Sequence, residues 1–136
     1  MLRRSLTLGN QLDQMSRLSA FVDRLAYDAC MNQKTRGQID LALDELVANV
    51  INYAYPENQP GKVRIEARLR NRVLTLVLTD SGKAFDPTAV ESPDTTLDID
   101  ERPIGGLGIF LVRQTMDDVQ YRRRDGKNIL TLKKRL

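Results

Sequence analysis

Residues 63–80 decide the fold and read Val-Arg-Ile-Glu-Ala-Arg-Leu-Arg-Asn-Arg-Val-Leu-Thr-Leu-Val-Leu-Thr-Asp. Apolar residues alternate with others on both sides of Asn71-Arg72, which predicts two antiparallel strands joined by a two-residue turn. This turn pairs Leu69 with Leu74, so one face of the hairpin is apolar. Asp80 lies an even number of positions after Leu74 on the same strand, so its side chain points to that apolar face. The pattern therefore places a carboxylate on the inner side, at the end of a core strand.

The rest of the chain supplies helices and further strands. Apolar residues at three- and four-residue steps predict helices over about 11–30, 37–54 and 106–117, and residues 3–8 suit a short first strand. A final hairpin turns at Asp125-Gly126, and its pairing gathers several side chains on one face: Val119, Tyr121, Asn128, Leu130 and Leu132. This order predicts an α+β fold, a two-layer α/β sandwich with a mixed, mostly antiparallel sheet and helices on one face.

Composition narrows the class of protein. The 136 residues suit a single domain over 1–136, and the net charge of +3 is too mild to indicate nucleic-acid binding by itself. One cysteine and no histidine exclude an intrachain disulfide, thiolate metal clusters and histidine-based catalysis. No apolar run is long enough to span a membrane, and the first residues lack the apolar stretch of a signal peptide, so we expect a cytoplasmic protein.

The second helix carries a polar stripe opposite its apolar face. Glu45 and Asn49 are four residues apart, and Asn52 joins the same stripe. A carboxylate and an amide oxygen there suit a hard cation such as Mg²⁺ and the orientation of a nucleophile. Taken alone, these residues are more typical of a solvated helix face.

The segment after the second strand reads Asp80-Ser-Gly-Lys-Ala-Phe-Asp86. An inward carboxylate needs a hydrogen-bond donor, and the exocyclic amine of a nucleobase would serve, with Gly82 letting a flat ring approach the backbone. An Asx-turn, in which Asp80 bonds its own backbone, explains the residue equally well. Residues 81–103 have no clear periodicity, and a loop of this length is usually functional or disordered.

Two further features are weaker. Gly105-Gly-Leu-Gly108 begins the third helix, where free amides favour phosphate, but a tight entry into a buried helix is an equally simple explanation. The basic triplets 122–124 and 133–135 alternate between the two faces of a strand, so neither forms one patch. We interpret them as part of a solvated hairpin.

The order and spacing of these motifs resemble the nucleotide boxes of the GHKL, or Bergerat-fold, ATPases. The three motifs begin at Glu45, Asp80 and Gly105. Residues 43–55 and 104–117 look in detail like the stand-alone anti-sigma factor serine/threonine kinases of the RsbW and SpoIIAB type. The resemblance covers nearly the whole chain.

The resemblance implies a role for each motif. Glu45 is similar to the family's catalytic general base, Asn49 to its Mg²⁺ ligand, and Asp80 to the acid that binds adenine, with Gly82 beneath the ring. The phosphate loop corresponds to Gly105, Gly106, Leu107 and Gly108, and residues 84–104 correspond to the lid over the nucleotide. Asn128 stands where the family often has a threonine near the adenine. Arg102 precedes the phosphate loop and is assigned no role.

The resemblance also implies an activity and partners. The expected activity is Mg²⁺-dependent transfer of the ATP γ-phosphoryl group to a serine or threonine of an anti-anti-sigma (STAS-domain) protein. A sigma factor is the expected competing partner and a homodimer the expected assembly, without direct nucleic-acid or membrane binding. The alternative is a nucleotide-dependent binding switch of the same fold with little or no kinase activity.

Overall fold

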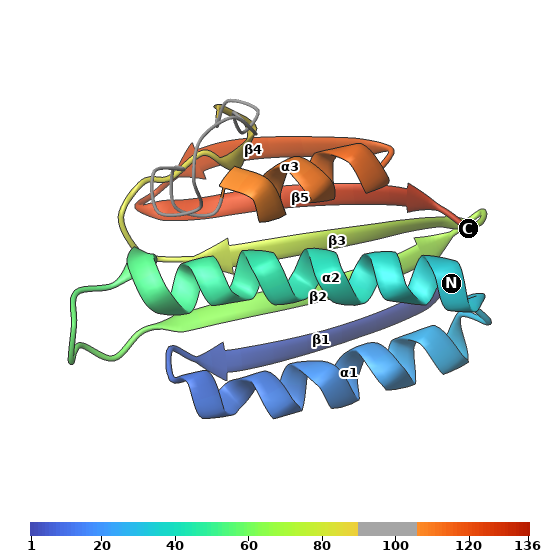
Figure 1. Cartoon of the computed structure of the whole chain (residues 1–136), viewed down its shortest axis with the longest axis horizontal. Helices are drawn as coiled ribbons and strands as arrows, with labels where there is room; N and C mark the ends of the chain where they lie inside the picture. Colours follow the sequence, from blue (N-terminus) through green and yellow to red (C-terminus); the bar gives the residue numbers. More distant parts are fainter. Residues whose placement is uncertain (90–105) are drawn as a thin grey trace.

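The computed structural model describes residues 1–89 and 106–136, with the backbone alone for residues 106 and 107. It contains a five-stranded sheet in the order β1-β2-β3-β5-β4, in which every neighbouring pair is antiparallel (Figure 1). The strands are β1 (Leu2–Gly9), β2 (Lys62–Arg70), β3 (Val73–Asp80), β4 (Asp118–Arg124) and β5 (Lys127–Arg135). The expected α+β sandwich is confirmed.

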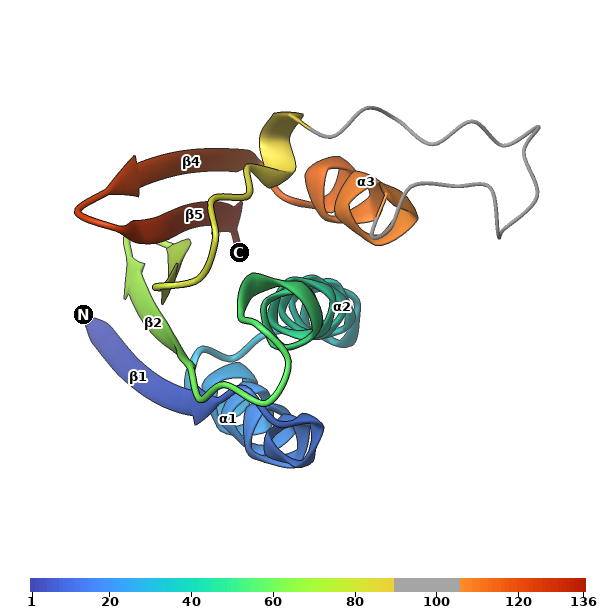
Figure 2. The same cartoon turned by 90° about the vertical axis from the view of Figure 1, so that its left-hand side faces the viewer.

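Three α-helices cover one face of the sheet, and no described helix covers the other face (Figure 2). They are α1 (Met15–Asp28), α2 (Gln33–Asn49) and α3 (Gly106–Thr115). Short 3₁₀ turns precede α1 (Leu12–Gln14) and follow β3 (Pro87–Ala89). No helix of the described residues is long and apolar enough to cross a membrane.

Both hairpin turns have the geometry that their sequences predict. Asn71 and Arg72 have φ angles of 52° and 63°, and Asp125 and Gly126 have φ angles of 52° and 75°. Consecutive positive φ values match the right-handed twist of the flanking strands. The predicted pairing of Leu69 with Leu74 is observed, as is the inward direction of Asp80.

The second helix differs from its prediction at both ends. It begins at Gln33 because the Asn32 side chain caps it, accepting a hydrogen bond of 2.8 Å from the Thr35 amide. After Asn49 the chain continues as one π-helical turn (Val50–Ala54) rather than as α-helix. Tyr55 is extended, as expected for a residue before proline, and the helical segment ends there.

The core lies between the helical layer and the inner face of the sheet. Its completely buried large side chains come from β1, all three helices and the central strands: Leu8, Leu18, Leu25, Ile39, Leu43, Ile65, Leu74, Leu76, Ile109 and Leu132. Burial of apolar surface on this scale is the main stabilising term for a domain of this size.

The basic triplets are mostly exposed, but the side chains of Lys134 and Arg123 donate hydrogen bonds to backbone carbonyls elsewhere in the fold. Lys134 donates a hydrogen bond of 2.7 Å from Nζ to the Thr115 carbonyl at the end of α3. This contact satisfies a carbonyl that α3 leaves free. Arg123 donates 2.8 Å from its guanidinium to the Gly82 carbonyl. Both side chains have the inward parity of their strands, but Arg123 remains exposed, so the solvated-hairpin interpretation is wrong only for the half-buried Lys134.

Adjacent residues of β3 provide a test of which face carries the stability. Leu76 is buried under the helices, whereas Val77 is half-buried on the uncovered face. We expect Leu76→Ala to lower the free energy of unfolding by about 2–5 kcal/mol and Val77→Ala by less than about 1.5 kcal/mol. Urea denaturation of both variants measures the difference, and equal losses would contradict this account of the core.

Candidate functional site

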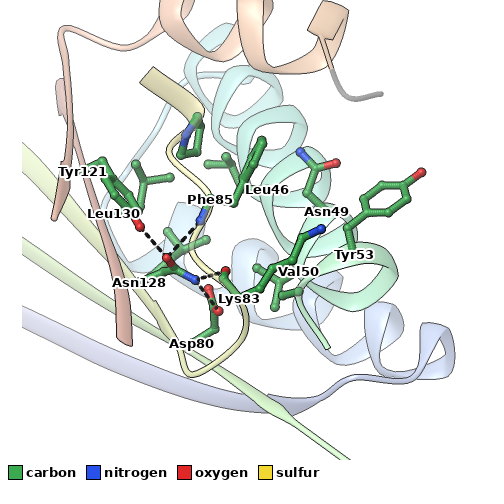
Figure 3. A pocket seen from close by; sticks show the side chains of 13 residues that line it. Leu46, Asn49, Val50, Tyr53, Asp80, Lys83, Phe85, Tyr121, Asn128 and Leu130 are labelled. Atoms are coloured by element: carbon green, nitrogen blue, oxygen red, sulfur yellow. Dashed lines mark hydrogen bonds between the residues drawn. The ribbon is translucent and has the colours of Figure 1, made fainter. Parts of the chain in front are cut away.

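A cavity of about 230 Å³ opens between the end of α2 and the inner face of β3, β5 and β4 (Figure 3). Its wall is mostly apolar, with polar groups at a few positions. The lining residues are Leu46, Asn49, Val50, Tyr53, Ala54, Leu78, Asp80, Lys83, Phe85, Pro87, Tyr121, Asn128 and Leu130. An apolar pocket with a few convergent polar groups is the usual form of a small-molecule site.

Asp80 lies at the end of β3 and is only 8% exposed. Its Oδ1 accepts hydrogen bonds of 2.9 Å from the Gly82 amide and 2.9 Å from Asn128 Nδ2. The bond to Gly82 is the Asx-turn that the sequence left open. Within the described part of the chain Oδ2 has no hydrogen bond. The Asx-turn therefore leaves one carboxylate oxygen available to a ligand, and the two interpretations of Asp80 are compatible.

Asn128 faces Asp80 across the β3–β5 ladder and is 6% exposed. Its Nδ2 donates to Asp80 Oδ1 and to the Lys83 carbonyl at 2.8 Å, and its Oδ1 accepts from the Phe85 amide at 3.3 Å and from the Tyr121 hydroxyl at 2.5 Å (Figure 3). A primary amide has two donor hydrogens and two acceptor lone pairs. Asn128 therefore uses its full hydrogen-bonding capacity inside the protein.

Gly82 follows Asp80 in a tightly packed turn. A Cβ atom at this position would lie 2.5 Å from the Ala54 Cβ and 2.8 Å from the Ala54 carbonyl carbon. The next amide, that of Lys83, donates 2.8 Å to the Ala54 carbonyl. The turn after β3 is thus packed against the π-helical turn after α2, and only glycine fits at position 82.

Asn49, the last residue of α2, lines the cavity with an unsatisfied group. Its amide nitrogen is buried and has no hydrogen-bond partner among the described residues. A buried polar group without a partner costs about 1–3 kcal/mol. Asn49 therefore fits a polar ligand that supplies a hydrogen-bond acceptor to this nitrogen.

Glu45 lies one helical turn before Asn49 and against the start of α3. A Cβ atom on Gly108 would lie 2.5 Å from the Glu45 carboxyl carbon, so the Glu45 carboxylate occupies the space that a side chain at 108 would fill. A carboxylate thus stands beside the first turn of α3. Asn52, which the sequence places on the same polar stripe, is exposed and does not line the cavity.

Some predicted site residues cannot be compared with the structure. Gly105, Arg102 and residues 90–104 of the expected lid lie outside the described residues, and for Gly106 and Leu107 only the backbone is described. The Gly106 and Gly108 backbones belong to the first turn of α3. None of the described residues form a group of three or more carboxylate, cysteine or histidine side chains suited to a metal ion.

The structure adds side chains that the sequence did not single out. Tyr53 and Phe85 are 46% and 41% exposed at the cavity, and Lys83 lines it as well. Tyr121 was placed on the inner face by hairpin register, but nothing in the pattern linked it to Asn128. The Tyr55 hydroxyl accepts 2.9 Å from the Ser81 amide and donates 2.5 Å to the Lys62 carbonyl, tying the turn to the start of β2.

The family model described as the histidine kinase-like ATPase domain matches residues 8–134. This chain belongs to the histidine kinase-like ATPase family. It is 31% identical over 112 residues to the serine/threonine-protein kinase BtrW of Bordetella bronchiseptica, covering 82% of this chain and 79% of that protein. It is also 29% identical over 112 residues to the serine-protein kinase RsbW of Bacillus cereus, covering 79% and 66% of the two chains. The resemblance to anti-sigma kinases is confirmed.

A solved structure agrees on the fold. The RsbU and RsbW domains of a Mycobacterium tuberculosis protein match with a TM-score of 0.72 and 14% identity, over 100% of this chain and 33% of that one. At this identity the match supports the architecture of the ATPase fold.

Three acidic side chains of α2 lie close enough in sequence to influence one another. Partial burial raises the pKa of Asp44, and the neighbouring charges of Asp40 and Glu45 raise it further. The three acids lie within residues 40–45 of α2, so their mutual repulsion favours the protonated form of Asp44.

Glycines 82 and 37 provide a matched test of the packing at the site. Gly82→Ala forces a side chain against the Ala54 backbone, which cannot rotate away, and we expect it to lower the free energy of unfolding by about 1–3 kcal/mol. Gly37→Ala in α2 meets nothing within 4 Å, and we expect it to raise stability by up to about 1 kcal/mol. Urea denaturation compares the two, and a neutral Gly82→Ala would contradict the tight turn.

Asp44 predicts a pH dependence of stability. Because the folded-state pKa is raised, Asp44 binds its proton more tightly in the folded state, and the folded state loses stability as pH rises through the folded pKa. Asp44→Asn removes this loss, so we expect a higher melting temperature at pH 7 and no gain at a pH below both pKa values. Thermal melts across pH measure this, with Glu57→Gln, an exposed acid in the loop after α2, as control. A variant less stable than the parent at pH 7 would refute the sign.

Proposed function

We propose that this protein is an ATP-dependent serine/threonine-protein kinase of the anti-sigma factor type. It phosphorylates an anti-anti-sigma (STAS-domain) partner and sequesters a sigma factor. One observation carries the proposal: a single apolar cavity brings together Asn49, Asp80 and Asn128, with Glu45 and Gly108 in contact beside it, in a chain similar to named serine-protein kinases.

In this proposal the deep end of the cavity binds adenine. Asp80 Oδ2 accepts a hydrogen bond from the exocyclic amine, because Oδ1 is already occupied. The Gly82 backbone lies beneath the ring, and Asn128 completes the wall. A buried acceptor that faces an amine also excludes a keto group at the same position, because two acceptors would then meet without a proton.

The triphosphate lies toward the start of α3. Gly105, Gly106, Leu107 and Gly108 form the phosphate loop, and the free amides and positive end of the helix attract the phosphates. Asn49 holds Mg²⁺ through its side-chain oxygen together with the phosphate oxygens, and its unpartnered amide nitrogen donates a hydrogen bond to a phosphate oxygen. When bound, Mg²⁺ neutralises charge on the transferring phosphoryl group.

Glu45 is the general base. The partner's hydroxyl oxygen attacks the γ-phosphorus while the bond from that phosphorus to the bridging oxygen breaks, and ADP leaves. Glu45 takes the hydroxyl proton. The contact between Glu45 and Gly108 places this carboxylate beside the phosphate loop, so positioning is the main contribution of the protein to the rate.

In the proposed organisation, the chain is a single ATPase domain over 1–136 with a lid over 84–104, and it works as a homodimer in the cytoplasm. β1 is an edge strand of the sheet, so it offers unpaired backbone groups to a second copy. Nucleic acid and membrane are not proposed as partners.

The decisive experiment measures ATP binding and phosphoryl transfer separately. We expect calorimetry with ATP and Mg²⁺ to detect binding, and γ-labelled ATP to label a STAS-domain protein from the same genome. Glu45→Gln retains ATP binding but lowers transfer by roughly 100- to 10,000-fold, because general-base catalysis is lost. Glu57→Gln serves as the matched control and should leave both quantities unchanged.

The outcomes separate the candidate functions. ATP binding without labelling of any STAS-domain protein favours the nucleotide-dependent binding switch over the kinase. Absence of ATP binding overturns both. If labelling survives Glu45→Gln, the kinase activity stands but Glu45 is not its general base.

A further inference from the structure

We infer that Tyr121 is a positioning residue for nucleobase recognition, which it controls through Asn128 and Asp80. The inference rests on the proposed function and adds a residue to its machinery. It starts from the Asn128 amide, which connects β4, β5, the end of β3 and the turn after it through four hydrogen bonds.

The neighbours of the Asn128 amide fix its orientation, because three of them can only donate or only accept a hydrogen bond at the atom that each faces. The Asp80 carboxylate and the Lys83 carbonyl only accept hydrogen bonds, so the atom that faces them is the nitrogen. The Phe85 amide only donates, so the atom that faces it is the oxygen. The Tyr121 hydroxyl, 2.5 Å from that oxygen, therefore donates its proton to Asn128.

Each hydrogen bond in this series fixes the orientation of the next side chain. Tyr121 holds the Asn128 oxygen, which directs Nδ2 at Asp80 Oδ1. The Gly82 amide binds the same oxygen from the other side, so the carboxylate cannot rotate without breaking a bond. The fixed rotation leaves Oδ2 for the ligand. Asn128 has no capacity left for direct contact with a base, so its effect on recognition passes through Asp80.

The chain of hydrogen bonds also holds the turn from Asp80 to Phe85. Asn128 binds the Lys83 carbonyl and the Phe85 amide, and Arg123 of β4 binds the Gly82 carbonyl at 2.8 Å. Two side chains of the β4–β5 hairpin thus hold the segment that follows β3. The hairpin positions both the acid and the turn that lies beneath the base in the proposed function.

The side chain of Tyr121 suits this role. It lines the cavity and is half-buried. It pairs with Leu130 across the β4–β5 ladder, and its ring packs against the edge of the core. Removing the hydroxyl leaves the ring and its packing in place. Tyr121→Phe therefore removes one hydrogen bond from Asn128 without opening a cavity.

The test compares ATP with purine riboside triphosphate, which lacks the exocyclic amine. In the parent protein we expect ATP to bind about 10- to 100-fold more tightly, as for a hydrogen bond to a charged acceptor. In Tyr121→Phe we expect this ratio to fall at least threefold, through weaker ATP binding, while the affinity for purine riboside triphosphate stays within twofold. Asn128→Ala should lower the ratio further.

Two controls exclude a general effect on folding. Tyr27→Phe removes the same hydroxyl from a side chain that is 80% exposed on α1, and we expect it to leave the ratio unchanged. Native-state hydrogen exchange follows the Phe85 amide, which bonds to Asn128, without any nucleotide. We expect Tyr121→Phe to speed exchange at Phe85 and to leave exchange in the core of β3 unchanged.

The outcomes distinguish this inference from the proposed function. A parent protein that prefers ATP, with a preference that survives both Tyr121→Phe and Asn128→Ala, overturns the inference alone. A parent protein that binds the two nucleotides equally overturns the role of Asp80 and, with it, the inference. Equal weakening toward both nucleotides in Tyr121→Phe, which leaves the ratio unchanged, assigns Tyr121 a structural role and also overturns the inference.

Discussion

The hydrogen bond between the Asp80 carboxylate and the Asn128 amide is the contact around which the site is built. A carboxylate at the buried end of a hydrophobic strand is costly unless donors satisfy it. Here a side-chain amide from β5 and a backbone amide from the following turn do so. The acid is thereby held in one orientation, and the turn after β3 is held with it.

The opposite wall of the cavity comes from the end of α2. The change from α-helix to a π-helical turn brings Val50, Tyr53 and Ala54 into the lining beside Asn49. Turns of this kind recur at functional sites. The Ala54 carbonyl accepts the Lys83 amide, so the helix side and the sheet side are joined by a backbone hydrogen bond. The cavity therefore lies between the end of α2 and the sheet, which the core already holds together.

The sequence predicted those parts of the fold that follow from local patterns. The β2–β3 hairpin, its register and the inward direction of Asp80 follow from alternation and a two-residue turn, and all are observed. The pairing of β3 with β5 joins residues 48 positions apart in sequence at Asp80 and Asn128, and alternation does not specify it. The hydrogen bond between them was therefore not predicted, although both residues were placed on the inner face.

The errors also have physical causes. Apolar spacing placed the start of the second helix at about residue 37, whereas the Asn32 cap begins it at Gln33, a signal that is present in the sequence. The π-helical turn keeps three- and four-residue apolar steps, so periodicity cannot distinguish it from α-helix. Arg123 was considered as one of a basic run, although its inward parity places it against the Gly82 carbonyl.

Because the strands pair in one register, the packing of the core also fixes the positions of the side chains that line the cavity. Leu130 and Leu132 share the inward parity of Asn128 on β5. A slip of β5 by one residue would turn all three side chains to the opposite surface, exposing two leucines as well as removing the amide. Burial of the two leucines therefore also keeps the hydrogen bond between Asp80 and Asn128 in register, although the bond itself is polar.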